Sequence, residues 1–179
     1  MMQICDGLAY LHSKKIVHKD LKLANIMLTK DLEVKICDFG LSDFLERDKK
    51  HIRCGTKIYM APECFKMPCK YTDKTDCYVL GIMLFEIWLG KMYHKMSYFS
   101  SCGCDDIVYR SINGRKPPFL AKNNPPRLVQ NFITECWNYY PDKRPSAAQC
   151  KQKLRKILMV LDTAAPASKP YWIMDVKKL

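Results

Sequence analysis

Glycine is scarce in this sequence, and its few copies are far apart. Seven glycines occur among 179 residues, at positions 7, 40, 55, 81, 90, 103 and 114, and no two are closer than nine residues. A glycine-rich phosphate loop needs several glycines in a short stretch, so that backbone N–H groups can approach the phosphates. The spacing therefore excludes such a loop within this chain.

Long apolar runs and paired metal-ligand spacings are also missing. The longest apolar run, at 79–89, is eleven residues long and contains Glu86, which favours a buried helix over a membrane span. The ten cysteines include no second matched pair at zinc spacing, and several fall within predicted helices and strands. The first residues show no secretory leader. We therefore expect reduced thiols, no bound zinc and a cytoplasmic location.

What the sequence does contain is three short motifs in a fixed order. The motif at 18–25 reads HKDLKLAN, the motif at 38–40 reads DFG, and the motif at 61–63 reads APE. Each string alone carries little information, because DFG is usually a turn and APE fits a helix start with proline in the first turn. Together, in this order and at these intervals, they resemble the C-terminal half of a eukaryotic protein kinase.

The resemblance implies a role for each of four residues. Phosphoryl transfer needs a carboxylate for the attacking hydroxyl, oxygen ligands for magnesium and a cation for the developing charge. By the resemblance, Asp20 is the catalytic base and Lys22 contacts the transferring phosphate of ATP. Asn25 and Asp38 are the implied ligands of Mg²⁺, a hard cation that prefers oxygen. The implied cofactors are therefore ATP and Mg²⁺.

The resemblance also implies structural or regulatory roles around this centre. The residues concerned are His18, Lys19, Phe39, Gly40, Thr56, Glu63, Asp76 and Arg144. Asp76 is expected to bond the backbone of the catalytic loop, because buried backbone donors need partners. Arg144 is expected to form a buried ion pair with Glu63 and to fix the end of the activation segment. Thr56 is expected within reach of Asp20.

A short hairpin is predicted between the first two motifs. Residues 26–37 read as two short strands around a turn. Because a hairpin returns the chain to its starting point, it places Asp38 next to Asn25. The resemblance further implies that His18 packs beside Asp38 and gives the catalytic loop its shape.

The rest of the chain is predicted to be mainly helical. Residues 1–17 carry apolar side chains at helical spacing, and 77–88 is apolar on nearly every face, which is typical of a helix buried in a core. Three further helices are predicted: one near 105–113, one marked by Leu128, Phe132, Cys136 and Tyr140, and one opened by a capping box at 146–149 with Cys150, Leu154, Ile157, Leu158 and Leu161 on one face. The fold class implied is mainly α: a kinase C-lobe, an α-helical bundle with short β-hairpins.

The predicted domain is a C-lobe without its N-lobe. We assign the kinase domain to 1–161 and a C-terminal tail to 162–179. Only seventeen residues precede the catalytic loop, and no strand lysine or phosphate-pairing glutamate lies among them. We therefore expect the chain alone to be inactive and to bind nucleotide weakly.

Several short stretches point to a class of kinase. Lys22 and the Gly55-Thr56 pair resemble serine/threonine kinases. The stretches ECW at 135–137 and RPS at 144–146 resemble the tyrosine-kinase-like group, near the receptor-interacting or dual-specificity kinases. Three features depart from the family pattern, one of which is Tyr78-Val79 in place of a commoner aromatic-serine pair. Lys19 stands where arginine is usual, and Ser42 is the only hydroxyl side chain in the activation segment at 41–54.

The expected function is ATP-dependent phosphorylation of serine/threonine hydroxyls in protein substrates, within intracellular signalling. The net charge of +12 is spread along the chain, and no nucleic-acid motif accompanies it, so nucleic acid is not expected as a partner. A dimer or scaffold partner stays open. The alternatives are a noncatalytic C-lobe that acts as a binding or scaffold module, and an incomplete gene model.

Overall fold

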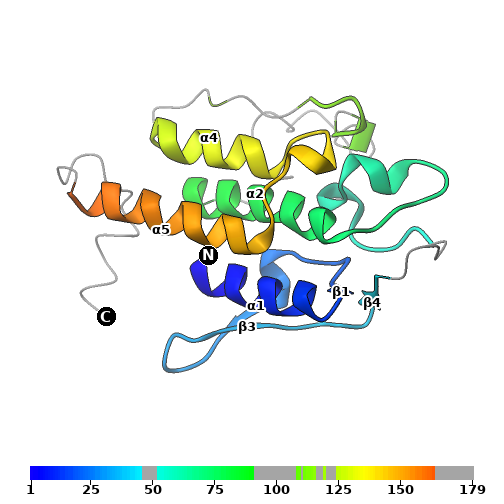
Figure 1. Ribbon diagram of the computed structural model, residues 1–179, viewed down its shortest axis with the longest axis horizontal. Helices are drawn as coiled ribbons and strands as arrows, with labels where there is room; N and C mark the ends of the chain where they lie inside the picture. Colours follow the sequence, from blue (N-terminus) through cyan, green and yellow to red (C-terminus); the bar gives the residue numbers. More distant parts are fainter. Residues whose placement is uncertain (46–51, 91–107, 110, 116–118, 120–123, 164–179) are drawn as a thin grey trace.

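The computed structural model describes residues 1–45, 52–90, 108–109, 111–115, 119 and 124–163. Its elements are, in chain order, α1 (Met2–Ser13), β1 (Ile16–Val17), η1 (Leu23–Asn25), β2 (Ile26–Leu28), β3 (Val34–Ile36), β4 (Asp43–Phe44), η2 (Lys57–Tyr59), η3 (Pro62–Phe65), α2 (Asp73–Leu89), α4 (Arg127–Cys136), η6 (Pro141–Lys143) and α5 (Ala147–Thr163), where η marks a short 3-10 helix. The strands form two antiparallel pairs, β1 with β4 and β2 with β3 (Figure 1). The predicted mainly α architecture with short antiparallel pairs is confirmed for the described residues.

The helix α2 forms the centre of the described core. The Thr72 hydroxyl caps its first turn by accepting a hydrogen bond from the N–H of Lys74 at 3.2 Å. Nearly every side chain from Thr75 to Trp88 is buried, as predicted for a helix that is apolar all round. Gly81 allows α4 to approach closely, because a Cβ at this position would lie 2.9 Å from the Cβ of Cys136.

The N-terminal helix α1 delivers the chain to the candidate site. It packs against α5 and buries Ile4, Cys5 and Leu8, while Leu11 is only partly buried (Figure 1). The helix ends at Ser13, and β1 follows directly. The predicted N-terminal helix is confirmed, and its end fixes where the catalytic loop begins.

The last described helix, α5, begins with the predicted capping box. The Gln149 side chain accepts a hydrogen bond from the N–H of Ser146 at 2.8 Å, and the Ser146 hydroxyl accepts one from the N–H of Gln149 at 3.3 Å. The expected apolar face is buried at most of its positions. The helix runs to Thr163, so residues 162–163 of the tail expected at 162–179 are helical, and residues 164–179 lie outside the described residues.

The helix marked by Leu128, Phe132, Cys136 and Tyr140 is present as α4, and two of these four side chains, Phe132 and Cys136, are buried. Leu128 is 47% exposed, and Tyr140 is 58% exposed and lies beyond the end of the helix. The buried positions are Val129, Phe132, Ile133 and Cys136. The four marker positions follow a strict four-residue repeat, and the outer two, Leu128 and Tyr140, do not lie on the buried face of α4. Four residues turn the helix about 40° past a full rotation, so such a repeat leaves the buried face within two steps.

Two remaining expectations concern local structure and thiols. Of the helix predicted near 105–113, residues 108–109 and 111–112 are helical, whereas 105–107 and 110 lie outside the described residues. The eight cysteines within the described ranges are all free thiols. No helix in these ranges is both long enough and apolar enough to cross a membrane.

Candidate active site

The loop at 18–25, which the family resemblance identifies as the catalytic loop, is held by a buried carboxylate at the start of α2. The loop follows β1, which pairs with β4 across the site. The Asp76 side chain is 1% exposed and accepts hydrogen bonds from the N–H of His18 at 3.0 Å and from the N–H of Lys19 at 3.2 Å. Bonds from backbone donors to a buried carboxylate are charge-assisted and satisfy groups that water cannot reach. Asp76 therefore fixes the first two residues of the loop.

A residue that the sequence analysis did not identify completes this anchor. Nε2 of His12, in the last turn of α1, lies 2.9 Å from Oδ2 of Asp76. The two residues are 64 positions apart, so no local pattern linked them. His12 thus ties α1 to α2 through the same carboxylate that holds the catalytic loop.

The predicted hairpin brings the two candidate magnesium ligands to one place. The strands β2 and β3 pair with Ile26 opposite Ile36, and the N–H of Cys37 donates to the carbonyl of Asn25 at 2.9 Å. Asp38 is the next residue and therefore lies beside Asn25. The amide nitrogen of Asn25 donates to the backbone carbonyl of Asp20 at 2.8 Å, which directs the side chain towards the catalytic loop.

His18 lies against the residues on both sides of Asp38. It is fully buried, its Nε2 is 3.0 Å from the carbonyl of Cys37, and its ring centroid is 5.1 Å from that of Phe39. Asp38 adopts a left-handed backbone conformation with φ 64°, which aspartate tolerates better than most residues. Its side chain is exposed, as is the following Gly40. The turn at 38–40 therefore lies at the surface and packs against the buried His18.

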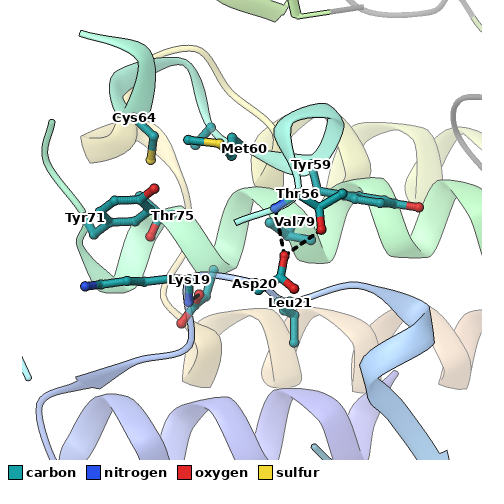
Figure 2. A pocket seen from close by; sticks show the side chains of 12 residues that line it. Lys19, Asp20, Leu21, Thr56, Tyr59, Met60, Cys64, Tyr71, Thr75 and Val79 are labelled. Atoms are coloured by element: carbon teal, nitrogen blue, oxygen red, sulfur yellow. Dashed lines mark hydrogen bonds between the residues drawn. The ribbon is translucent and has the colours of Figure 1, made fainter. Parts of the chain in front are cut away.

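Two residues, Lys22 and Thr56, converge on the candidate base Asp20. The Lys22 ammonium lies 2.7 Å from Oδ2 of Asp20. The backbone N–H and the hydroxyl of Thr56 both donate to Oδ1 of Asp20, at 2.8 and 2.7 Å, and Figure 2 draws these two bonds as dashed lines. Lys22 also donates to the Thr56 hydroxyl at 2.9 Å. The side chains of Asp20, Lys22 and Thr56 therefore form a closed cluster in which each is bonded to the other two.

These contacts keep Asp20 ionised. Burial alone would raise the pKa of Asp20, whose exposed fraction is 9%. The hydrogen bonds from Lys22 and Thr56 outweigh that effect and hold the pKa below its ordinary value. At neutral pH the side chain is a carboxylate that can accept a proton.

Gly55 is required by the close passage of two backbone segments. Its φ is +96°, a conformation that L side chains rarely adopt. A Cβ at this position would lie 2.5 Å from the carbonyl oxygen of Lys19. The glycine therefore allows Thr56 to reach Asp20.

Lys19, the departure from the family pattern, points away from Asp20. Its side chain extends beneath the ring of Tyr71 (Figure 2), with Nζ 5.2 Å from the ring centroid. The same ammonium lies 2.9 Å from Oδ2 of Asp43. Lys19 therefore contacts Tyr71 and Asp43 and takes no part in the cluster around Asp20.

The structure contains the expected ion pair between Glu63 and Arg144. Two nitrogens of the Arg144 guanidinium donate to the two carboxylate oxygens of Glu63, at 2.6 and 2.8 Å. The guanidinium also donates to three backbone carbonyls, those of Asn138, Lys74 and Tyr139. The Arg144 side chain is fully buried, so these bonds satisfy a charge that water cannot reach.

The class of chemistry follows from this geometry. Asp20 is an ionised carboxylate that contacts the Lys22 ammonium and the Thr56 hydroxyl. Asn25 and Asp38, at the two ends of the β2–β3 hairpin, offer oxygen atoms beside it. This arrangement suits phosphoryl transfer. The chain belongs to the protein kinase domain family, which it matches over residues 1–154.

Named kinases are among its relatives. The chain is 36% identical over 155 residues to RGS domain-containing serine/threonine-protein kinase A of Dictyostelium discoideum, covering 87% of this chain and 13% of that protein. It is 36% identical over 164 residues to dual specificity protein kinase shkE of the same organism, covering 88% and 22%. It is 30% identical over 180 residues to probable serine/threonine-protein kinase CCRP1 of Zea mays, covering 95% and 28%. The chain thus spans between 13% and 28% of the length of these relatives.

Proposed function

We propose that residues 1–179 form the C-terminal lobe of an ATP-dependent protein kinase that phosphorylates serine and threonine hydroxyls. The observation that carries the proposal is the cluster of Asp20, Lys22 and Thr56, in which one carboxylate is bonded to both other side chains. The named serine/threonine and dual-specificity kinases among the relatives support it.

In the proposed reaction, Asp20 orients the substrate hydroxyl and accepts its proton. The hydroxyl oxygen forms a bond to the γ-phosphorus of ATP, the bond from that phosphorus to the β,γ-bridging oxygen breaks, and ADP leaves. Lys22 stabilises the negative charge on the transferring phosphoryl group. The depressed pKa of Asp20 supports this role, because a base must be unprotonated before the reaction.

The donor set at the hairpin fits Mg²⁺. The Asn25 amide nitrogen is bonded to the Asp20 carbonyl, which leaves the amide oxygen for a cation, and the Asp38 carboxylate is exposed beside it. Both offer oxygen, the ligand that Mg²⁺ prefers. When bound, Mg²⁺ would neutralise charge on the nucleotide phosphates.

We further assign the chain to the tyrosine-kinase-like group of serine/threonine kinases. The stretches at 135–137 and 144–146 support this assignment, as does the match to both serine/threonine and dual-specificity enzymes. Residues 1–179 contain no glycine-rich phosphate loop, and no strand with a phosphate-pairing lysine precedes the loop at 18–25. The proposed reaction therefore needs an N-terminal lobe encoded outside these residues.

The test is phosphate transfer by the full-length product that contains this chain. Wild type is incubated with labelled ATP–Mg²⁺ and a library of serine, threonine and tyrosine peptides. We expect label on serine and threonine, and a loss of about two to four orders of magnitude in Asp20→Asn. Asp31→Asn, at an exposed position in the hairpin turn, is the matched control and should retain full activity. Wild-type turnover in Asp20→Asn, or no transfer by wild type, would refute the proposal.

A further inference from the structure

Lys19 is a buried cation that contacts two different segments within the described part of the chain. Its side chain is 6% exposed, and its ammonium is 2.9 Å from the Asp43 carboxylate in β4. The ring of Tyr71 lies on another side of the same ammonium, at 5.2 Å. A cation at this depth needs such partners, because burial removes most of its hydration. Lys19 therefore joins the described start of the activation segment to Tyr71.

Tyr71 in turn holds the described end of that segment. Its hydroxyl donates to the carbonyl of Cys54 at 2.5 Å and accepts a hydrogen bond from the N–H of Cys54 at 3.0 Å. Both backbone groups of Cys54 are thus bonded to one side chain. Tyr71 is 4% exposed, so these two hydrogen bonds are shielded from water.

Cys54 leads directly to the cluster at the candidate base. Gly55 passes against the carbonyl of Lys19, and Thr56 then donates twice to Asp20. A displacement at Cys54 would therefore be transmitted over two residues to the Asp20 carboxylate.

We propose that Asp43, Lys19 and Tyr71 form a latch that positions Thr56 on Asp20 without a phosphate on the activation segment. The part that concerns catalysis rests on the proposed kinase function. The Asp43 carboxylate supplies to Lys19 the negative charge that a phosphate would otherwise supply. Ser42, the only hydroxyl residue in 41–54, donates to the carbonyl of His18 at 3.2 Å and so already has an internal partner.

The three latch residues act as positioning residues, through Cys54 and Thr56. The latch needs a cation at position 19, because the Asp43 carboxylate and the face of the Tyr71 ring both attract positive charge. Arginine meets this requirement and methionine does not, although methionine is similar in length to lysine. A role in packing alone would be satisfied by methionine, so these two substitutions separate the alternatives.

Amide hydrogen exchange on the full-length product tests the latch without requiring kinase activity. In Lys19→Met, we expect the amides of Cys54 and Thr56 to exchange about tenfold faster, the scale of one lost hydrogen bond or ion pair. Lys19→Arg should restore slow exchange. Lys14→Met is the matched control, because Lys14 lies 5.7 Å from the ring centroid of Tyr10 at an exposed site and should change nothing at Cys54.

Two further measurements make the result decisive. Exchange of the buried α2 amides at Ile82 and Met83 should be unchanged, which excludes general unfolding of the Lys19→Met variant. Phosphatase treatment of wild type should leave the exchange at Cys54 and Thr56 as it was. If Lys19→Met keeps wild-type protection, or if phosphatase treatment removes it, the latch is wrong.

Activity measurements separate the latch from the proposed kinase function. If wild type transfers phosphate, Lys19→Met should lower kcat about tenfold with KM for ATP unchanged, and Lys19→Arg should recover it. An unchanged kcat together with faster exchange would refute the positioning role. If wild type transfers no phosphate while Lys19→Met still speeds exchange, the proposed kinase function fails and the latch stands.

Discussion

Arg144 and Glu63 form a bidentate ion pair, with nitrogen–oxygen distances of 2.6 and 2.8 Å, although they are 81 positions apart in the sequence. Arg144 reaches this pair from the turn between η6 and α5, and Glu63 comes from η3, just after the segment that carries Thr56. The Arg144 side chain is fully buried, whereas that of Glu63 is 13% exposed. The ion pair therefore links the end of the segment that carries Thr56 to the helical core.

Removing the arginine should destabilise the fold strongly. Arg144→Ala leaves the Glu63 carboxylate without its cation and three carbonyls without their donor, so we expect a loss of roughly 3–5 kcal/mol in the free energy of unfolding. Urea denaturation of both proteins measures the difference. Arg155→Ala, on the exposed face of α5, is the control and should change stability by less than about 0.5 kcal/mol. A similarly small effect of Arg144→Ala would show that the buried pair contributes little.

The anchor at Asp76 should also be sensitive to substitution. Asp76→Ala leaves the buried N–H groups of His18 and Lys19 without an acceptor, at a cost of about 1–3 kcal/mol each. Asp73→Ala, in the same turn of α2, removes only a favourable charge near the helix start and should cost about 0.3–1 kcal/mol. Thermal or urea unfolding distinguishes the two. Equal effects of both variants would mean that the hydrogen bonds to the loop add no stability.

The sequence predicted local features well because their signals are local. The hairpin at 26–37, the capping box at 146–149 and the buried helix at 77–88 each depend on side chains within a few positions of one another. The contact between Thr56 and Asp20 spans 36 positions, and it was expected from the family resemblance and not from a local signal.

The contacts that the sequence did not reveal join distant segments. His12 meets Asp76 across 64 positions, and Lys19 meets Asp43 across 24. The sequence shows that lysine replaces the usual arginine at position 19. It does not show the partners of Lys19, because these depend on how β1, β4 and the start of α2 pack. No periodicity or turn signal encodes such packing.

Nucleotide binding by the polypeptide 1–179 alone should be weak. Asp38 and Asn25 offer oxygens for magnesium, but Mg²⁺ gives up its water reluctantly and needs fixed phosphates to bridge. Met27 and Leu28, which the family resemblance places in the floor of the adenine site, are more than half exposed. We expect a Kd for ATP–Mg²⁺ no tighter than about 1 mM, or about −4 kcal/mol, by calorimetry. A micromolar Kd would mean that residues 1–179 hold the phosphates without another lobe.

The hydroxyl of Thr56 should set the acidity of Asp20. Thr56→Val keeps the backbone N–H bond to Asp20 but removes the hydroxyl bond, one of the contacts that hold the pKa of Asp20 below its ordinary value. Carboxyl carbon NMR titration should therefore show a higher pKa of Asp20 in the variant. Thr134→Val is the control, because the Thr134 hydroxyl bonds the carbonyl of Gln130 at an exposed site.

The same substitution predicts how stability depends on pH. A carboxyl group whose pKa is lower in the folded state stabilises the fold above its unfolded pKa of about 3.9, and this contribution is lost as the pH falls through the folded pKa. Thr56→Val weakens that contribution, so the variant should be about 1.5 kcal/mol less stable at pH 7. The difference in stability between the variant and wild type should narrow as the pH falls through the lowered folded-state pKa of Asp20, because Asp20 then becomes protonated in both folded proteins. Urea denaturation at pH 7 and pH 3 measures the difference in the free energy of unfolding between the variant and wild type at each pH. A gap that is the same at both pH values would show that Thr56 acts by packing and leaves the charge of Asp20 unaffected.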